Sequence, residues 1–410
     1  MTPNIALLLL LGLWLCSHII VFGSLSRRTK YLSVFVSLLL LTVVYATKPA
    51  TFDLPRYSVY FETRIPPWIS STEFKKDGWR IEDLTEIERG EFFSNRFFQN
   101  SPGFTFLLDL ARPIFPHGSY FPRIIKERHV SDSLVLLVGI LGLALLSSSL
   151  SLLYFKPEKE QHDLYFYGVM GLSILGSVFF FVGSQNAIRQ FLGTCFSVLA
   201  FAAVIRKKHA LALVSVALSF LFHPWSPVFA ILSVMFWKVK QVCEKLRFDR
   251  VHRIAINEYV FALIVGVAAV VVIKIGIKLG LPYFTTYFQI DTTKEVYRTD
   301  ASIKLLLVAA VLVLTDCIAG RKNREPKLDP ISLRRCFLIF LTPLVIYPEV
   351  FSRLLMFYFA VELIFVVWAL THSSKRVLFS GCVVFLSYAV ALNALNILLD
   401  KDWLEIMLHG

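Results

Sequence analysis

The feature that most constrains this chain is a series of apolar runs, many of them roughly 20 residues long. As a helix, a run of that length crosses the hydrocarbon core of a bilayer, which is roughly 30 Å thick. The chain has 410 residues, of which 56% are hydrophobic, and its mean hydropathy is +0.65. This composition excludes an ordinary soluble protein, and we predict an all-α polytopic membrane protein.

The runs predict about 12 transmembrane helices. Three of them, 210–222, 226–237 and 336–348, are short enough to be tilted, broken or re-entrant, so the expected number is ten to twelve. The predicted segments are 4–22, 31–47, 133–155, 164–183, 187–205, 210–222, 226–237, 259–281, 301–319, 336–348, 350–371 and 377–398.

The basic residues predict the orientation. By alternation, six connections fall on one side of the membrane, and they contain 22 of the 42 Lys and Arg residues. Short loops of the other side, such as 184–186 and 223–225, have none. Because Lys and Arg are enriched in cytoplasmic loops, we expect the basic side to be cytoplasmic and both termini to lie outside. The six connections are 23–30, 156–163, 206–209, 238–258, 320–335 and 372–376.

One connection is far longer than the others and divides the chain into three expected parts. Residues 1–47 form the first two transmembrane helices, 48–132 form a long outer loop, and 133–410 form the helical core. The loop is rich in aromatic residues, and its middle could form amphipathic helices on the membrane surface. Long loops are usually functional, as lids or binding surfaces.

Four polar residues begin the long loop: Asp53, Arg56, Tyr57 and Tyr60. At helical spacing they share one face. Arginine forms bidentate hydrogen bonds with phosphate oxygens, and aromatic rings stack on sugars, so this face suits a sugar phosphate. The alternative is a structural Asp–Arg pair in an interfacial aromatic belt. Further along the loop, Pro102–Gly103 starts either a re-entrant loop or a plain helix.

A second group surrounds Arg189, which starts an apolar helix together with Asn186 and Gln190. The helix dipole disfavours a cation at this end, but a bound anion would meet both the guanidinium and free backbone N–H groups. The alternative is an arginine that snorkels to the interface. His223 ends the next apolar run, directly before Pro224. Three roles are open for it: it binds a sugar hydroxyl, acts as a general base or caps a broken helix.

A third group lies near the end of the chain. Glu349 and Arg353 are spaced so that they can form a pair on one helix, and Tyr358 follows them. Arg353 would be a second guanidinium on the outer side, which suits a diphosphate, and Arg298 adds positive charge there.

Several classes are excluded by missing motifs. The sequence has no P-loop, HExxH, GxSxG or CxxC pattern, so we expect no cofactor and no metal. The net charge of +13 belongs to the cytoplasmic loops and predicts no nucleic-acid partner. Nucleotide sugars are absent outside the cell, so an external glycan donor would have to be lipid-linked.

The order of these motifs resembles the EpsG/Wzy-type polysaccharide polymerases of bacteria. The order is an acid-Arg-Tyr-Tyr segment, a Pro-Gly loop, N-x-x-R-Q at a helix start, an H-P break and a late S-R-x-x-x-x-Y. The matching residues are Asp53, Arg56, Tyr57, Tyr60, Pro102, Gly103, Asn186, Arg189, Gln190, His223, Arg353 and Tyr358.

The resemblance implies a GT-C-like, metal-independent glycosyltransferase of the bacterial inner membrane. Its substrates would be glycan repeat units linked to undecaprenyl diphosphate, and its partners a chain-length regulator and a flippase. Arg189 and Arg353 would stabilise the leaving diphosphate. Asp53, or else His223 or Glu349, would take the proton of the acceptor hydroxyl.

Three other readings stay open. The first is a flippase of lipid-linked glycans, which would need a polar path through the bilayer. Few charges are expected at mid-helix depth apart from Lys274 and Lys304, which disfavours it. The second is another external transferase, such as an O-antigen ligase, an acyltransferase or a polyprenyl-phosphate-sugar transferase. The third is a membrane scaffold.

Overall fold

The computed structural model describes ten labelled helical elements and a further short apolar helix, Ala301–Ala310, in the second and third predicted parts of the chain. The described residues are 26–39, 101–114, 132–154, 164–245, 258–281, 301–313 and 329–372, except 27, 30, 33, 38, 112, 178, 181, 182, 185, 186 and 311. The elements are α6 (Pro102–Ala111), α7 (Asp132–Tyr154), α8 (Leu164–Leu175), α10 (Ile188–Ile205), α11 (His209–Phe222), α12 (Pro227–Lys245), α14 (Glu258–Lys278), α17 (Pro330–Leu341), the 3-10 helix η2 (Thr342–Ile346) and α18 (Pro348–His372).

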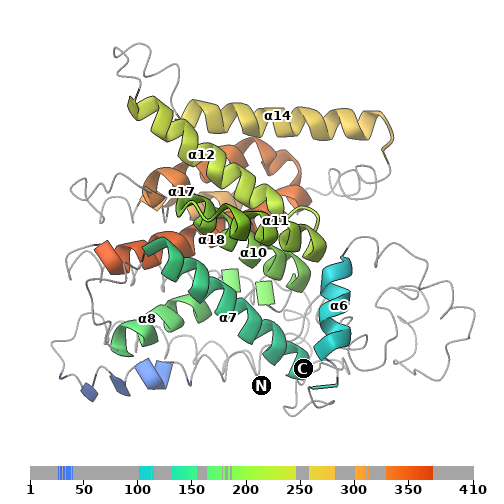
Figure 1. Cartoon of the computed structure of the whole chain (residues 1–410). Coiled ribbons are helices and arrows are strands. Elements are labelled where there is room, and N and C mark those ends of the chain that lie inside the picture. The colour runs from blue at the N-terminus through green and yellow to red at the C-terminus, as the bar shows by residue number, and fades with distance from the viewer. Residues whose placement is uncertain are drawn as a thin grey trace, which may run out of the picture. The chain divides into compact units, whose positions relative to one another are not determined.

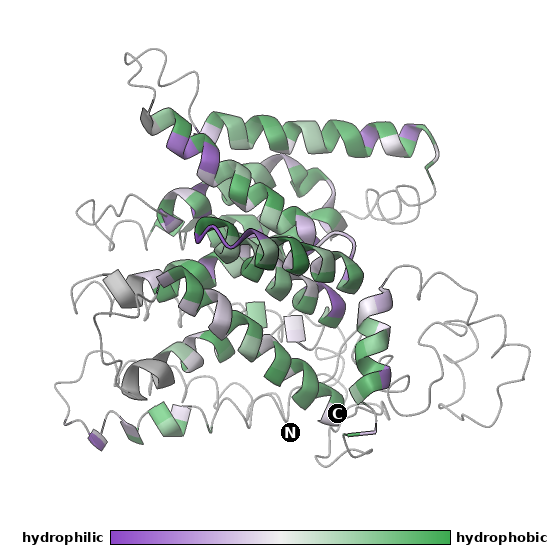
Figure 2. Cartoon of the chain, in the orientation of Figure 1, coloured by the Kyte–Doolittle hydropathy of each residue, from purple (hydrophilic) through white to green (hydrophobic). Residues whose placement is uncertain are grey.

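Apolar helices dominate the described part of the chain. Four of its helices are long and apolar enough to cross a membrane: Ser133–Tyr154, Ile188–Ile205, Glu258–Lys278 and Val350–Trp368. Figure 2 shows hydrophobic residues along most of α7 and α14, while polar residues gather at one end of α12. The protein is therefore an all-helical, polytopic membrane protein. The total of about 12 spans, the orientation and the three-part division remain predictions.

The chain forms two compact units. The first contains residues 1–228 and 389–410, and the second contains residues 229–388. Each unit is described by itself below, with its elements labelled in Figure 1.

In the first unit, α10 and α11 form an antiparallel hairpin with closely spaced backbones (Figure 1). A methyl group built at Gly193 would lie 2.9 Å from Ser226 Cβ, so only glycine allows this approach. Ser219 donates its hydroxyl to the Gly193 carbonyl at 2.8 Å, and Ser197 donates to the Ser226 carbonyl at 2.6 Å. Small residues and interhelical hydrogen bonds are what hold helices together in lipid.

The basic turn between these helices joins them to α7. Its backbone ends α10 in a Schellman motif: Lys207 has a φ of 59°, and the N–H of Lys208 donates to the Ala203 carbonyl at 2.8 Å. The Arg206 guanidinium donates to the carbonyls of Leu152 and Leu153 at 2.6 and 2.7 Å, which caps the C-terminus of α7. The C-terminal ends of α7 and α10 therefore lie at the same level, as the predicted alternation of loops requires.

In the second unit, α14 packs against α17 with an equally close approach. A methyl group built at Gly266 would lie 2.5 Å from the backbone oxygen of Phe340. Aromatic rings fill the centre of this unit: Phe337 lies 5.7 Å from Phe229 and 5.4 Å from Phe236, measured between ring centroids. All three rings are buried.

The start of α17 corrects one sequence-based boundary. The segment predicted to begin at 336 begins at Pro330 instead, because Asp329 caps the helix and accepts hydrogen bonds from the N–H groups of Ile331 and Ser332. An aspartate followed by proline at the first helical position is a strong start signal. Arg334 and Arg335 therefore lie in a helix and not in the predicted 320–335 connection.

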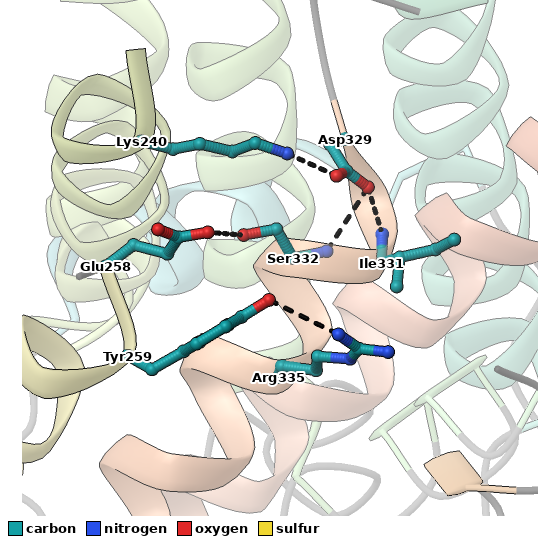
Figure 3. A network of polar contacts seen from close by, with 7 residues as sticks. All are labelled: Lys240, Glu258, Tyr259, Asp329, Ile331, Ser332 and Arg335. Atoms are coloured by element: carbon teal, nitrogen blue, oxygen red, sulfur yellow. Dashed lines mark hydrogen bonds and ion pairs between the residues drawn. The ribbon is translucent and has the colours of Figure 1, made fainter. Parts of the chain in front are cut away.

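A similar correction applies to α12, which continues to Lys245 and so includes Lys238 and Lys240. Figure 3 shows how this end of α12 is tied to its neighbours: Lys240 pairs with Asp329, Ser332 donates to Glu258 and Arg335 donates to Tyr259. These contacts join α12, α14 and α17.

We predict that Gly266→Ala destabilises the protein by about 1–3 kcal/mol, because the added methyl group meets helix backbone that cannot rotate away. The measurement is thermal unfolding of the protein purified in detergent. The matched control is Gly139→Ala in α7, where a methyl group meets nothing within 4 Å. There the helix propensity of alanine should leave stability unchanged or raise it by up to about 1 kcal/mol. Equal behaviour of the two variants would show that the α14–α17 approach is not close.

Candidate functional site

Arg189, in the first turn of α10, contacts a residue that lies far from it in the sequence. Its Nη1 atom donates a hydrogen bond to the Ser101 hydroxyl at 3.1 Å. Ser101 directly precedes α6 and is fully buried, whereas Arg189 is half-buried. The N-terminal ends of α6 and α10 therefore meet at this contact.

The start of α6 also packs against the end of α11. A methyl group built at Gly103 would lie 2.9 Å from Leu221 Cβ, and the rings of Phe104 and Phe222 meet edge to face at 6.4 Å. Of the two expectations for Pro102–Gly103, the plain helix start is the one observed. Within the predicted 48–132 outer loop, α6 is thus an apolar helix that packs on the core of the first unit.

His223 lies directly after this end of α11 and is 8% exposed. Its backbone N–H donates to the Ser219 carbonyl at 3.0 Å. A methyl group built at Gly193, one turn beyond Arg189 in α10, would lie 3.2 Å from His223 Cβ. Gln190 is buried, and its backbone carbonyl accepts a hydrogen bond from the Ser226 hydroxyl at 3.3 Å.

The structure thus brings together three of the predicted residues, Arg189, Gln190 and His223, and adds Ser101 to them. All four belong to the first unit. We call this group the Arg189 cluster. It combines a guanidinium, an imidazole, an amide and a hydroxyl at the junction of α6, α10 and α11. Such a set can bind an anion and hydroxyl groups together.

Sequence reasoning missed Ser101, although it directly precedes the Pro102–Gly103 motif. A serine before Pro at a helix start reads as an N-cap. Nothing in the local sequence pairs it with Arg189, because the two residues are joined only by the tertiary packing of α6.

Many of the predicted site residues lie outside the described residues. Glu349 is in the first turn of α18, but its side chain is not described. The roles of all these residues remain predictions. The residues outside the described part are Asp53, Arg56, Tyr57, Tyr60, Asn186 and Arg298.

Arg353 and Tyr358 lie on α18 in the second unit, in different surroundings. Arg353 is half-buried near the start of the helix. Tyr358 is fully buried, and its hydroxyl donates to the carboxylate of Glu362. Its predicted role in substrate binding stays a prediction, and the contact with Glu362 gives the hydroxyl a partner within the protein.

Glu362 belongs to a buried ion pair that the sequence did not reveal. Its Oε1 atom lies 3.1 Å from Nε of Arg334, and the two side chains are 2% and 0% exposed. The expected charges near mid-helix depth, Lys274 and Lys304, did not include this pair. Glu362 is a carboxylate in the middle of an apolar run, which was a visible signal. Arg334 was hidden by the misplaced start of α17.

Metal chemistry has no candidate in the described residues, where no group of three His, Cys, Asp or Glu side chains could hold an ion. What the described geometry offers is hydrogen-bond donors and positive charge, both in the Arg189 cluster.

Comparison with known proteins adds the family. The model of the EpsG family matches residues 128–405, which include Arg189, Gln190, His223 and Arg353. Asp53 and the Pro102–Gly103 segment precede the matched range. No curated protein and no solved structure matches the chain significantly. Since the matched range covers well over half of the sequence, the chain belongs to the EpsG family, and this membership implies a role in polysaccharide biosynthesis.

Proposed function

We propose that this protein is a membrane glycosyltransferase that joins glycan repeat units linked to undecaprenyl diphosphate into a polysaccharide. The reaction takes place at the outer face of the bacterial cytoplasmic membrane. The observation that carries this proposal is the Arg189 cluster, in a chain whose family membership already implies polysaccharide biosynthesis.

The start of α10 suits the diphosphate of a lipid-linked glycan. The N-cap residue is Ala187, which has no side-chain acceptor for the N–H groups of the first turn. An anion at this end meets those N–H groups, the positive end of the helix dipole and the Arg189 guanidinium. Ser101 holds one guanidinium nitrogen and so limits the directions in which Arg189 can point.

In the proposed reaction, the acceptor hydroxyl oxygen attacks the anomeric carbon of the donor glycan. The bond from that carbon to the diphosphate oxygen breaks, and the lipid diphosphate leaves with its electron pair. Arg189 stabilises the negative charge that develops on it. A general base takes the hydroxyl proton: Asp53 is the first candidate, with His223 and Glu349 as alternatives. Of these three side chains, His223 is the one that the structure describes, as a member of the Arg189 cluster.

Further residues and partners are proposed on the sequence alone. Arg353 is a second guanidinium for the diphosphate, and Arg56, Tyr57 and Tyr60 would line the sugar path. A chain-length regulator and a flippase are the expected protein partners. No cofactor is required, because the diphosphate already activates the donor glycan and the acceptor glycan supplies the nucleophilic hydroxyl.

A transporter of lipid-linked glycans is the second candidate function, and one observation favours it. Glu362 lies in a helix apolar enough to span a membrane, and its ion pair with Arg334 of α17 is buried. Such charges often mark transport pathways. Purified protein in vesicles separates the two functions. A polymerase lengthens the glycan without moving it across the bilayer, whereas a transporter moves it without lengthening. An O-antigen ligase would instead transfer the glycan to a different lipid acceptor.

We predict that Arg189→Ala lowers the rate of polymerisation by about 10²–10³-fold, the usual cost of removing one group that stabilises a developing charge. Arg189→Lys keeps the charge but loses the forked donors, and its activity should fall between those of Arg189→Ala and the parent. The measurement is the length distribution of the glycan made from lipid-linked repeat units by purified protein. Lys208→Ala is the matched control, because it removes an exposed cation from the other end of the same hairpin. Normal long chains from Arg189→Ala would exclude this role.

Ser101→Ala should reduce the polymerisation rate by about 10–10²-fold, because a hydrogen bond to a charged group contributes about 1.5–3 kcal/mol. The loss arises from a less restricted Arg189, so it should vanish when the change is made in the Arg189→Ala background. Ser149→Ala is the control: Ser149 is equally buried but donates only to its own helix, at the Leu145 carbonyl. If the losses of the two single variants multiply in the double variant, Ser101 does not act through Arg189.

Arg353→Ala should also lower the polymerisation rate, by about 10²-fold if Arg353 binds the leaving diphosphate. The comparison is Lys238→Ala, which removes an exposed cation from the same unit. Protein amount in the membrane is measured for both variants. If Arg353→Ala polymerises as well as Lys238→Ala, the second arginine has no part in the reaction.

A further inference from the structure

The buried ion pair of the second unit makes more contacts than two charges need for pairing. Arg334, on α17, lies 3.1 Å from Glu362 and also places its guanidinium 3.8 Å from the centre of the Phe365 ring. Glu362 accepts a further hydrogen bond from the hydroxyl of Tyr358. We call Arg334, Tyr358 and Glu362 the buried triad.

Stability alone is a weak reason for such a triad. Removing two charges from water costs about as much as their attraction returns, and a well-packed apolar pair often serves a fold equally well. What this ion pair adds is placement, because the two charged groups meet only when α17 and α18 have a suitable relative rotation.

Two contacts with α17, from Arg334 to Glu362 and from Arg334 to Phe365, fix the rotation of α18 about its own axis. Residues four positions apart lie on one helix face, so Tyr358 and Glu362 face the same way. Phe365, three positions later, lies beside them. One guanidinium on α17 thus binds two neighbouring points on α18, at Glu362 and at Phe365. A rotated or shifted α18 would lose both contacts.

The same rotation sets the direction of Arg353. Arg353 lies nine positions before Glu362, and each residue of an α-helix turns by about 100°. The two residues are therefore about 180° apart, on opposite faces of α18. The face of α18 that carries Tyr358 and Glu362 lies against α17, so Arg353 is directed away from α17. Arg353 is half-buried, in contrast to the fully buried triad.

We propose that the buried triad is a positioning element that sets the rotation of α18 and thereby presents Arg353 to the substrate. In this role, Arg334, Tyr358 and Glu362 do not touch the glycan or its diphosphate. This inference rests on the proposed function only in the role given to Arg353, and the rotation itself is tested without activity.

The first experiment measures rotation. Cysteine is placed at Arg353 or at the neighbouring Ser352, which is also half-buried and about 100° away around the helix. The full-length protein is purified in detergent and treated with a polar maleimide. Mass spectrometry of the peptide that contains residue 352 or 353 gives the labelling rate at each position, and the ratio of the two rates reports rotation. General loosening raises both rates, but rotation changes their ratio.

The test variant replaces the charges by apolar groups, Arg334→Met with Glu362→Leu, so that no unpaired charge stays buried. We expect the ratio of labelling rates to shift while the protein remains folded. The matched control is Arg335→Met. Arg335 is the next arginine of α17, donates to Tyr259 and is not a member of the triad. The control should leave the ratio unchanged. An unchanged ratio in the folded double variant would overturn the proposal.

A milder variant decides the matter if the double variant does not accumulate. Phe365→Leu removes one of the two contacts between α17 and α18 and keeps the charge pair. A shift of the ratio in Phe365→Leu supports the proposal, and an unchanged ratio overturns it.

The second experiment connects rotation to polymerisation. The apolar variant should lower kcat, by up to about 100-fold, because a small misplacement of a group at the site is enough to do so. Combined with Arg353→Ala, it should cause no further loss, since both changes remove the same interaction. Multiplied losses would show that the triad does not act through Arg353.

The two experiments separate the two proposals. If the labelling ratio shifts but Arg353→Ala polymerises normally, the triad sets the rotation of α18, and the catalytic role of Arg353 fails. If Arg353→Ala is inactive but the ratio never shifts, Arg353 keeps its role and the positioning proposal fails.

Discussion

Close packing between α10 and α11 is the interaction on which the Arg189 cluster depends. Lipid provides no hydrophobic force that pushes helices together, so their association needs close backbones and hydrogen bonds. Gly193 lets the hairpin close, and the hydroxyls of Ser197 and Ser219 bond across it to carbonyls of the partner segment. The same approach places His223 one turn from Arg189. The packing that holds the hairpin together therefore also builds the candidate site.

In the second unit, an ion pair also contributes to the association of the helices. The aromatic core around Phe337 is nonspecific and could tolerate sliding, whereas the Arg334–Glu362 pair forms only when its two helices have a suitable relative rotation. The polar contacts of Lys240, Asp329 and Ser332 fix the end of the same helix α17 (Figure 3). Polar contacts therefore occur at two heights along α17, at its start and at Arg334. They also explain why charged residues occur where an apolar sequence was expected.

Local signals predicted much of the fold. The spans at α7, α10, α11 and α14 agree with the helices within a few residues, because long apolar runs leave a chain no other stable form in lipid. The errors fall where two signals compete. At Arg334 and Arg335, positive charge suggested a loop, but the Asp329–Pro330 cap had already started the helix. At Glu362, the apolar run hid a charge that has its partner on another helix.

The sequence by itself determined the class of the protein and most of its described helical segments, and it pointed to Arg189 and His223 as candidate site residues, because hydropathy and motif order are local properties. It could not place Ser101 against Arg189, bury Tyr358 or pair Arg334 with Glu362. Each of these contacts joins residues from different helices, and helix faces meet according to packing and rotation, which no short stretch of sequence encodes. Tertiary structure alone therefore decided which polar residues of this membrane protein share a site and which hold its helices in place.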